Sequence, residues 1–257
     1  MSPKFQKWFK NRRIVLSLPL LVLGCAAPAA YQAETGQVTI RQASSSLQQE
    51  GAEAFSSYKQ KHQVSRDSAA RSRVMRVASR LKPHVNLPGA AWGFEVFEDP
   101  SANAFALPGG KVGVNTGLLK VAQTDGQLAT VIAHEMAHVT SNHAESRLRN
   151  KEAVALGGAI LGAVLGQGQD LGALAQKGTE VAFGLSFSRA QELEADRIGT
   201  IFMAKAGYDP EEAITLWQRM GAQSQSGRLE FLSTHPVSST RIQKLREFMP
   251  HAKAQQR

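Results

Sequence analysis

The sequence predicts an α+β fold that is mostly helical and carries a small antiparallel β-sheet. Apolar residues recur at helical spacing in Leu128–Val139, and again at Ile242, Leu245 and Phe248. Strand-like alternation over residues 92–97 and the Pro-Gly-Gly turn that follows residue 107 predict the sheet. The chain has 257 residues, which is enough for one domain with a substantial core.

The N-terminal residues have the pattern of a secreted lipoprotein. Basic side chains up to Arg13 precede the apolar run Ile14–Leu23, which is too short to span a membrane as a stable helix. The sequence Val-Leu-Gly-Cys ending at Cys25 looks like a lipobox, so we predict a lipoprotein signal peptide over residues 1–24 and lipidation of Cys25. Ordinary signal-peptide cleavage among the alanines at 26–30 is the alternative. Cys25 is the only cysteine, so no disulfide can form within the chain.

The rest of the chain divides into three predicted parts. Residues 25–50 are rich in Ala, Gln, Ser and Thr and are predicted to form a flexible tether. The folded domain is predicted over residues 51–250, followed by a short tail at 251–257. Within the domain, residues 153–177 are unusually rich in Gly and Ala. They could form closely packed helix or a flap, and the sequence does not separate these alternatives.

The charge of the chain is concentrated at its N-terminus. Residues 1–24 hold five Lys and Arg and no acidic residue, so their removal lowers the net charge from +9 to +4. The arginines between residues 66 and 80 lie opposite an apolar helix face made by Val74, Val77 and Leu81. This pattern is typical of a solvated helix face, and we expect no nucleic acid partner.

Three strands are predicted before the central helix. They lie at residues 92–97, 103–107 and 111–115, with the last two joined by the Pro-Gly-Gly turn. An exposed strand edge could pair with an extended peptide, or the hairpin could be scaffold only. Asn103 is a candidate substrate-binding residue, because it could contact the backbone of such a peptide; it could equally orient the turn.

The central helix carries the motif His-Glu-Met-Ala-His at residues 134–138. Residues four apart point the same way on a helix, so His134 and His138 can direct their rings at one metal ion. Glu135 is rotated by about 100° from His134, close enough to act as a general base toward water. The two histidines and the carboxylate have the spacing typical of a catalytic zinc site.

A catalytic zinc site needs a third protein ligand. His143 is one residue out of register with the class of sites whose third ligand is another histidine, so we disfavour it. Glu192 and Asp196 are four residues apart on a predicted helix and share a face. We predict that Glu192 is the third ligand and that Asp196 accepts a hydrogen bond from the ring of a ligand histidine. The alternative for this pair is a charged, solvated helix face.

These motifs resemble the HExxH zinc metallopeptidases of the CAAX prenyl protease and HtpX type, and among them the periplasmic branch of LoiP-like and BepA-like lipoproteins. The likeness rests on residues 134–138, on Glu192–Asp196 and on the strand-turn-strand at 103–119, and it covers about residues 51–248. It implies a zincin-type metallopeptidase domain with one Zn²⁺ per chain. It also implies a periplasmic location at the outer membrane of a Gram-negative bacterium.

The segment Ser-Thr-His-Pro around His235 resembles the segment that closes over the site in the same branch. We predict a catalytic role for His235, which could donate to the oxyanion formed during peptide hydrolysis. Alternatively, its ring could occupy the open position on zinc at rest. Arg241 follows in the same segment and is a weaker candidate.

The resemblance implies a zinc-dependent endopeptidase that degrades unfolded or misassembled cell-envelope proteins, with Glu135 as the general base. Its partners would be such proteins as substrates, the membrane through a lipid anchor, and the outer-membrane assembly machinery as a further candidate. The alternative is a zinc-bearing periplasmic chaperone or assembly factor for outer-membrane proteins, with little or regulated proteolysis. A structural zinc protein is disfavoured, because closed zinc sites are usually rich in cysteine and this chain has no cysteine beyond Cys25.

Overall fold

The computed structural model describes residues 31–32, 37–150, 186–223 and 230–256. The predicted signal peptide, Cys25 and the Gly/Ala-rich residues 153–177 lie outside this part of the chain. Among the helices that are described, none is both long and apolar enough to cross a membrane.

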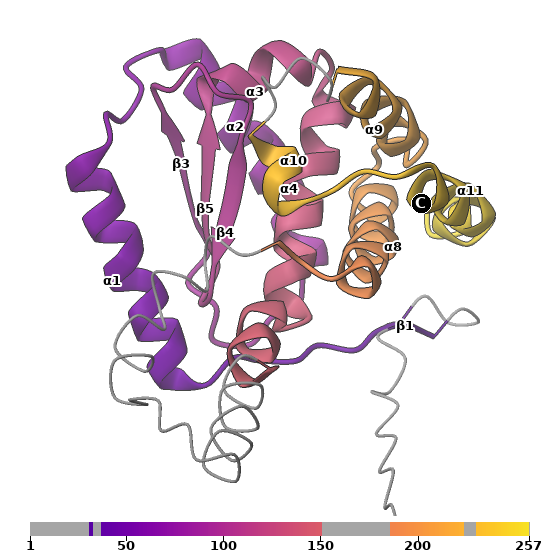
Figure 1. The fold of residues 1–257 in the computed structure, drawn as a ribbon, viewed down its shortest axis with the longest axis horizontal. Helices are drawn as coiled ribbons and strands as arrows, with labels where there is room; N and C mark the ends of the chain where they lie inside the picture. The colour runs from indigo at the N-terminus through magenta and orange to yellow at the C-terminus, as the bar shows by residue number, and fades with distance from the viewer. Residues whose placement is uncertain (1–30, 33–36, 151–185, 224–229, 257) are drawn as a thin grey trace, which may run out of the picture.

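Helix α4 (Asp125–Thr140) runs through the middle of the domain, between the sheet and helix α8 (Arg189–Lys205) (Figure 1). Every α4 residue from Gly126 to Thr140 is buried. The helix begins where the hydroxyl of Thr124 accepts a hydrogen bond from the backbone N–H of Gln127 at 3.0 Å. The metal motif predicted from the sequence therefore lies on the most enclosed helix of the domain.

The three predicted strands form one sheet, but the sheet is mixed rather than antiparallel. Strand β4 (Ala104–Leu107) pairs antiparallel with β5 (Lys111–Asn115), and Gly109 and Gly110 in the turn between them adopt φ of 80° and 86°. Strand β3 (Gly93–Phe97) pairs parallel with β5, which gives the order β3-β5-β4. The prediction of a wholly antiparallel sheet was wrong, because β5 inserts between the two strands that precede it. Its Val112 and Val114 are fully buried, as expected of a central strand.

The remaining elements surround this centre. Helix α1 (Ser45–Lys61) lies on the opposite side of the sheet from α4 (Figure 1). The other described elements are β1 (Tyr31–Gln32), β2 (Gln37–Val38), α2 (Ser68–Leu81), the 3-10 turn η1 (Lys82–His84), α3 (Thr116–Val121), α9 (Glu212–Gln223), α10 (Phe231–Thr234) and α11 (Ser239–Lys253). The predicted boundary between tether and domain at residue 51 falls inside α1. The domain is mostly helical, as the sequence predicts.

Helix α2 differs from its prediction on its polar side. Its predicted apolar residues are fully buried: Val74, Val77 and Leu81. However, the arginines are not simply solvated, since Arg73 and Arg76 form ion pairs with Asp125 in the first turn of α4 at 3.0 and 2.9 Å. Arg80 donates to the backbone carbonyls of Ala206 and Gly207, just after α8. These arginines fasten α2 to the two helices that carry the candidate site.

Candidate metal centre

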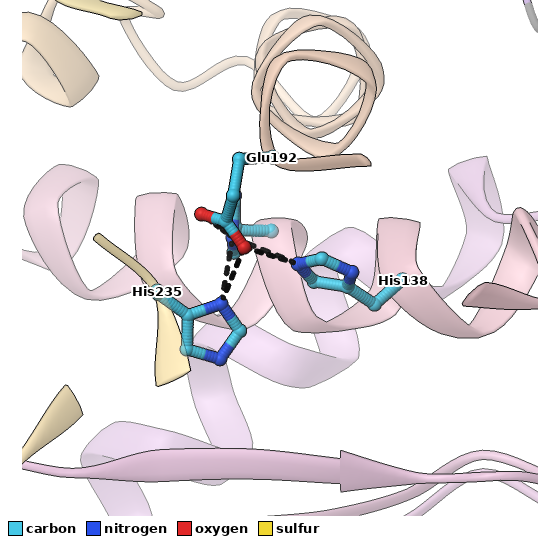
Figure 2. A group of neighbouring side chains, drawn as sticks. His138, Glu192 and His235 are labelled. Atoms are coloured by element: carbon cyan, nitrogen blue, oxygen red, sulfur yellow. Dashed lines mark hydrogen bonds and ion pairs between the residues drawn. The ribbon is translucent and has the colours of Figure 1, made fainter. Parts of the chain in front are cut away.

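Four buried side chains from three parts of the fold converge on one point. Figure 2 shows three of them: His138, Glu192 and His235. His134 and His138 come from α4, Glu192 from α8, and His235 from the loop after α10. One ligand atom from each residue lies within 4.8 Å of every other. The structure thus brings together the three ligands predicted from the sequence and adds His235 as a fourth candidate.

The spacing of these atoms fits a tetrahedral zinc ion. Nε2 of His134 is 3.0 Å from Nε2 of His138 and 3.4 Å from Nδ1 of His235. The Glu192 carboxylate oxygens are 3.6 Å from His134 Nε2, 3.4 Å from His138 Nε2 and 3.0 Å from His235 Nδ1. In a tetrahedron with metal–ligand bonds of about 2.0–2.1 Å, the ligand atoms lie about 3.3–3.4 Å apart. The residues present therefore fit one Zn²⁺.

The protonation states also suit a metal site. Burial lowers the pKa of His138 well below its usual range and lowers that of His235 to about 4, so both rings are neutral and can ligate. Burial alone would raise the pKa of Glu192. Its contacts with His134, His138 and His235 outweigh burial and hold the pKa well below its usual range. Glu192 is therefore an anionic ligand candidate beside the neutral rings of His138 and His235.

Asp196 lies behind His134, where the sequence predicts it. Its Oδ1 is 3.1 Å from Nδ1 of His134, so this ring nitrogen carries the proton and Nε2 faces the other ligand atoms. Burial alone would lower the pKa of His134, but Asp196 and Glu192 outweigh it and raise the pKa to about 9, so the ring is cationic near neutral pH and zinc binding would displace the proton on Nε2. Asp196 thus fixes both the tautomer and the orientation of the ring.

Arg241 has a larger place in the site than the sequence suggested. It is 4% exposed, and its Nε and Nη2 donate to the two carboxylate oxygens of Asp196 at 2.5 and 2.7 Å. Nη1 forms an ion pair with Glu192 and donates to the Pro236 carbonyl at 3.1 Å. Arg241 precedes Leu245 and Phe248 on the buried face of α11. A charged residue in that apolar periodicity was the signal that could have identified its role.

Glu135 lies beside the ligand group and faces a cleft of about 400 Å³. Burial is the main cause that raises the pKa of Glu135, to about 8. Its Oε1 is 3.3 Å from Nε2 of His235. The cleft is also lined by β4 and by Asn103, whose side chain donates to Glu230 at 3.1 Å. Asn103 therefore lines the cleft, and its side-chain hydrogen bond goes to Glu230 and not to the turn.

Two further residues of the site were missed in the sequence. The ring of Phe187 stacks on His138 with centroids 3.7 Å apart and on His235 at 5.0 Å. The guanidinium of Arg147 lies 3.8 Å from the centroid of the Phe187 ring and lines the cleft. Neither residue belongs to a recognisable motif, since both reach the site only through the folding of distant segments. His143, disfavoured as a ligand, indeed contacts the far nitrogen of His138 and is not among the four ligand candidates.

The contacts of Arg241 predict an unequal response to substitution. Arg241→Met should lower the free energy of unfolding by about 3–5 kcal/mol, because it leaves buried carboxylates without their cation. Arg241→Lys should recover only part of this loss, because an ammonium cannot make the two-pronged contact with Asp196. The measurement is urea denaturation, with Lys244→Met as the control on the exposed side of the same helix. A loss for Arg241→Met no larger than that of the control would contradict this account.

Comparison with known proteins agrees with this site. Residues 68–249 match the sequence profile of peptidase family M48. The mitochondrial metalloendopeptidase OMA1 of Schizosaccharomyces pombe is 40% identical over 182 residues, which cover 70% of this chain and 53% of that protein. OMA1 of Saccharomyces cerevisiae is 37% identical over 174 residues, 65% of this chain and 49% of that protein.

A bacterial relative has the name that the sequence resemblance led us to expect. The beta-barrel assembly-enhancing protease of Escherichia coli O157:H7 is 33% identical over 172 residues, which cover 63% of this chain and 35% of that protein. The resemblance to the BepA-like branch is thereby confirmed, whereas the mitochondrial relatives were not anticipated. The chain spans about half the length of the OMA1 relatives and about a third of the bacterial protease. The chain belongs to peptidase family M48, whose members are metallopeptidases.

Proposed function

We propose that this protein is a zinc-dependent endopeptidase that acts on unfolded or misassembled proteins of the cell envelope. The observation that carries the proposal is the position of Glu135. This buried carboxylate lies between a group of four ligand candidates and a cleft lined by β4. A protein that only bound a structural metal would have no need of a carboxylate there.

The residues around Glu135 support separate roles in metal binding and proton transfer. His134, His138 and Glu192 would hold the zinc ion. When bound, zinc would polarise the scissile carbonyl and lower the pKa of the attacking water. Glu135 would take a proton from that water and pass it to the leaving amine. Burial raises the pKa of Glu135 to about 8, which favours a carboxylate that can both accept and release a proton near neutral pH.

Strand β4 supports the choice of an extended peptide as substrate. It is an edge strand of the three-stranded sheet, and its residues line the same cleft as Glu135. An extended chain added to this edge would be held by backbone hydrogen bonds, with little demand on its side chains. Such binding requires an unfolded segment, and this favours unfolded proteins as substrates. Asn103 immediately precedes β4 and would contact the bound chain there.

His235 supports regulation of this activity. Its Nδ1 lies among the ligand atoms and its Nε2 lies at Glu135, so the ring would take the fourth position on a bound zinc ion while contacting the proposed general base. A catalytic zinc site keeps one position open. We therefore favour His235 as a resting ligand over His235 as an oxyanion donor. A site closed in this way would suppress hydrolysis. It therefore also supports the alternative function, a zinc-bearing chaperone or assembly factor with little proteolysis.

The envelope location is proposed from the N-terminal sequence and from the bacterial relatives. Their name, beta-barrel assembly-enhancing protease, refers to the assembly of β-barrel proteins. The predicted signal peptide over residues 1–24 and the lipobox at Cys25 support a periplasmic protein anchored to the outer membrane by lipid. Envelope proteins would then be the available substrates.

The central test compares the purified full chain with Glu135→Gln in cleavage of unfolded casein. The parent should carry about one zinc per chain and cleave, and Glu135→Gln should keep zinc but lose activity by at least about 100-fold, because the base is gone. Glu247→Gln, a change of the same type on the exposed side of α11, should leave activity unchanged. Removing zinc with a chelator should abolish cleavage, and adding zinc back should restore it.

The same experiment separates the two functions. If the parent holds zinc and prevents aggregation of unfolded envelope proteins without cutting them, the chaperone alternative replaces the endopeptidase. If neither protein binds zinc, the metal site and both functions built on it are wrong.

His235→Ala should raise the rate of casein cleavage, because it removes the resting ligand and frees Glu135. The control is His251→Ala, an exposed histidine on α11. A fall of about 100-fold or more would instead assign His235 to the oxyanion.

Cys25→Ala should abolish incorporation of labelled palmitate during expression in a Gram-negative host and release the protein from the membrane fraction. The label should be present in the parent. An unlabelled parent with a mature N-terminus within residues 26–31 would show ordinary signal-peptide cleavage instead.

A further inference from the structure

A ligand histidine is held most firmly when its second ring nitrogen has a partner. His134 has Asp196 in this role, but neither of the two carboxylates predicted from the sequence provides a partner for the second ring nitrogen of His138. The structure places His143 there, with its Nδ1 2.7 Å from Nδ1 of His138. Both rings are buried, at 4% exposed for His138 and 1% for His143. The contact is therefore enclosed and directed at the back of a ligand.

The direction of the hydrogen bond follows from the position of the ligand group. Nε2 of His138 faces the other ligand atoms, so it presents its lone pair and the proton resides on Nδ1. Nδ1 of His143 must then accept this proton, and a neutral His143 carries its own proton on Nε2. That nitrogen points at the carboxylate of Glu194, 3.7 Å away, and has no closer polar partner among the described residues. Burial lowers the pKa of His143, in agreement with a neutral ring.

Glu194 connects this pair to the N-terminal part of the domain. Its carboxylate forms an ion pair with Arg41 at 3.2 Å. Burial would raise the pKa of Glu194, but His143 and Arg41 lower it, so the group is anionic. Glu194 lies away from the Glu192 and Asp196 face of α8, so it has no part in the site predicted from the sequence.

The segment that carries Arg41 is docked on the end of the metal helix. The backbone N–H of Arg41 donates to the Thr140 carbonyl at 2.7 Å, in the last turn of α4. The side chain of Asn142 donates to the Gln42 carbonyl at 3.3 Å, and the Ser44 N–H donates to Glu145 at the same distance. These residues lie within the predicted tether, yet three separate contacts hold them beside His143.

We propose that His143 and Glu194 are positioning residues that orient the metal ligand His138, and that Arg41 stabilises them from the segment before α1. The inference rests on the proposed metal site and goes beyond it. It assigns a role to two residues on the outer side of the ligand group and makes residues 41–44 part of the site's support. One consequence is that the strength of metal binding depends on the docking of the segment that joins the domain to its predicted anchor.

The test measures zinc affinity of the full chain by competition with a chromogenic chelator. His143→Phe keeps a ring but removes the acceptor, and should weaken zinc binding about 10–100-fold. His143→Asn places an amide oxygen near the position of Nδ1, and should recover most of the loss. Glu194→Gln removes the charge behind His143 with little change of shape, and should weaken binding by a smaller factor of about 3–10. Arg41→Ala should act in the same direction as Glu194→Gln. His251→Phe is the matched control and should change nothing.

A second readout separates orientation from general damage. The visible absorption spectrum of the cobalt-substituted protein reports ligand geometry, and it should change in His143→Phe and return toward the parent in His143→Asn. If His143→Phe fails to fold, Glu194→Gln decides the question, since its fold should be intact by circular dichroism. Parent-like zinc affinity in a folded His143→Phe, or in Glu194→Gln when the first variant does not fold, overturns the inference while leaving the proposed function intact. Failure of the parent to bind zinc would instead refute the proposed function itself.

Discussion

The burial of two carboxylates, Glu192 and Asp196, is the constraint on which the rest of this structure depends. Each is at most 3% exposed, and a buried charge is tolerated only when oppositely charged or hydrogen-bonding groups surround it. The compensation comes from Arg241 on α11 and from the histidines on α4. Helices α4, α8 and α11 are therefore locked together by the same atoms that prepare the metal centre.

This arrangement ties metal binding to folding. Asp196 contacts Nδ1 of His134, and Arg241 in turn binds the Asp196 carboxylate. The fold therefore sets the orientation of the His134 ring before any metal ion binds. The close approach of ring nitrogens and carboxylate oxygens is also easier to maintain when a cation lies between them. The other ligand candidate on α4, His138, has no carboxylate behind its ring. Its support is indirect and comes through His143 from a segment near the N-terminus.

The sequence could reveal the parts of this site that depend on local spacing. His134 and His138 are one helical turn apart, as are Glu192 and Asp196, so each pair is readable without knowledge of the fold. The mixed sheet was not readable, because the place of β5 depends on the burial of Val112 and Val114 against distant helices. The same holds for Arg241, which meets Asp196 across 45 residues of chain. In the sequence, the burial of Arg241 was indicated only by its position in line with the apolar residues of its helix.

The most informative residue for control of the site is His235, because one ring contacts both the ligand atoms and Glu135. Its loop is held by Arg241 at the Pro236 carbonyl and by Phe187, whose N–H donates to the Thr234 carbonyl at 3.0 Å. The bonds from Arg241 to Asp196 are made by other nitrogens than the one that contacts Pro236. Withdrawal of His235 would therefore break contacts of the loop and the contact of His235 with Glu192, without releasing Asp196 from Arg241. On the proposed function, movement of this one histidine would open the fourth metal position and free Glu135 together, while Asp196 keeps its contacts with His134 and Arg241.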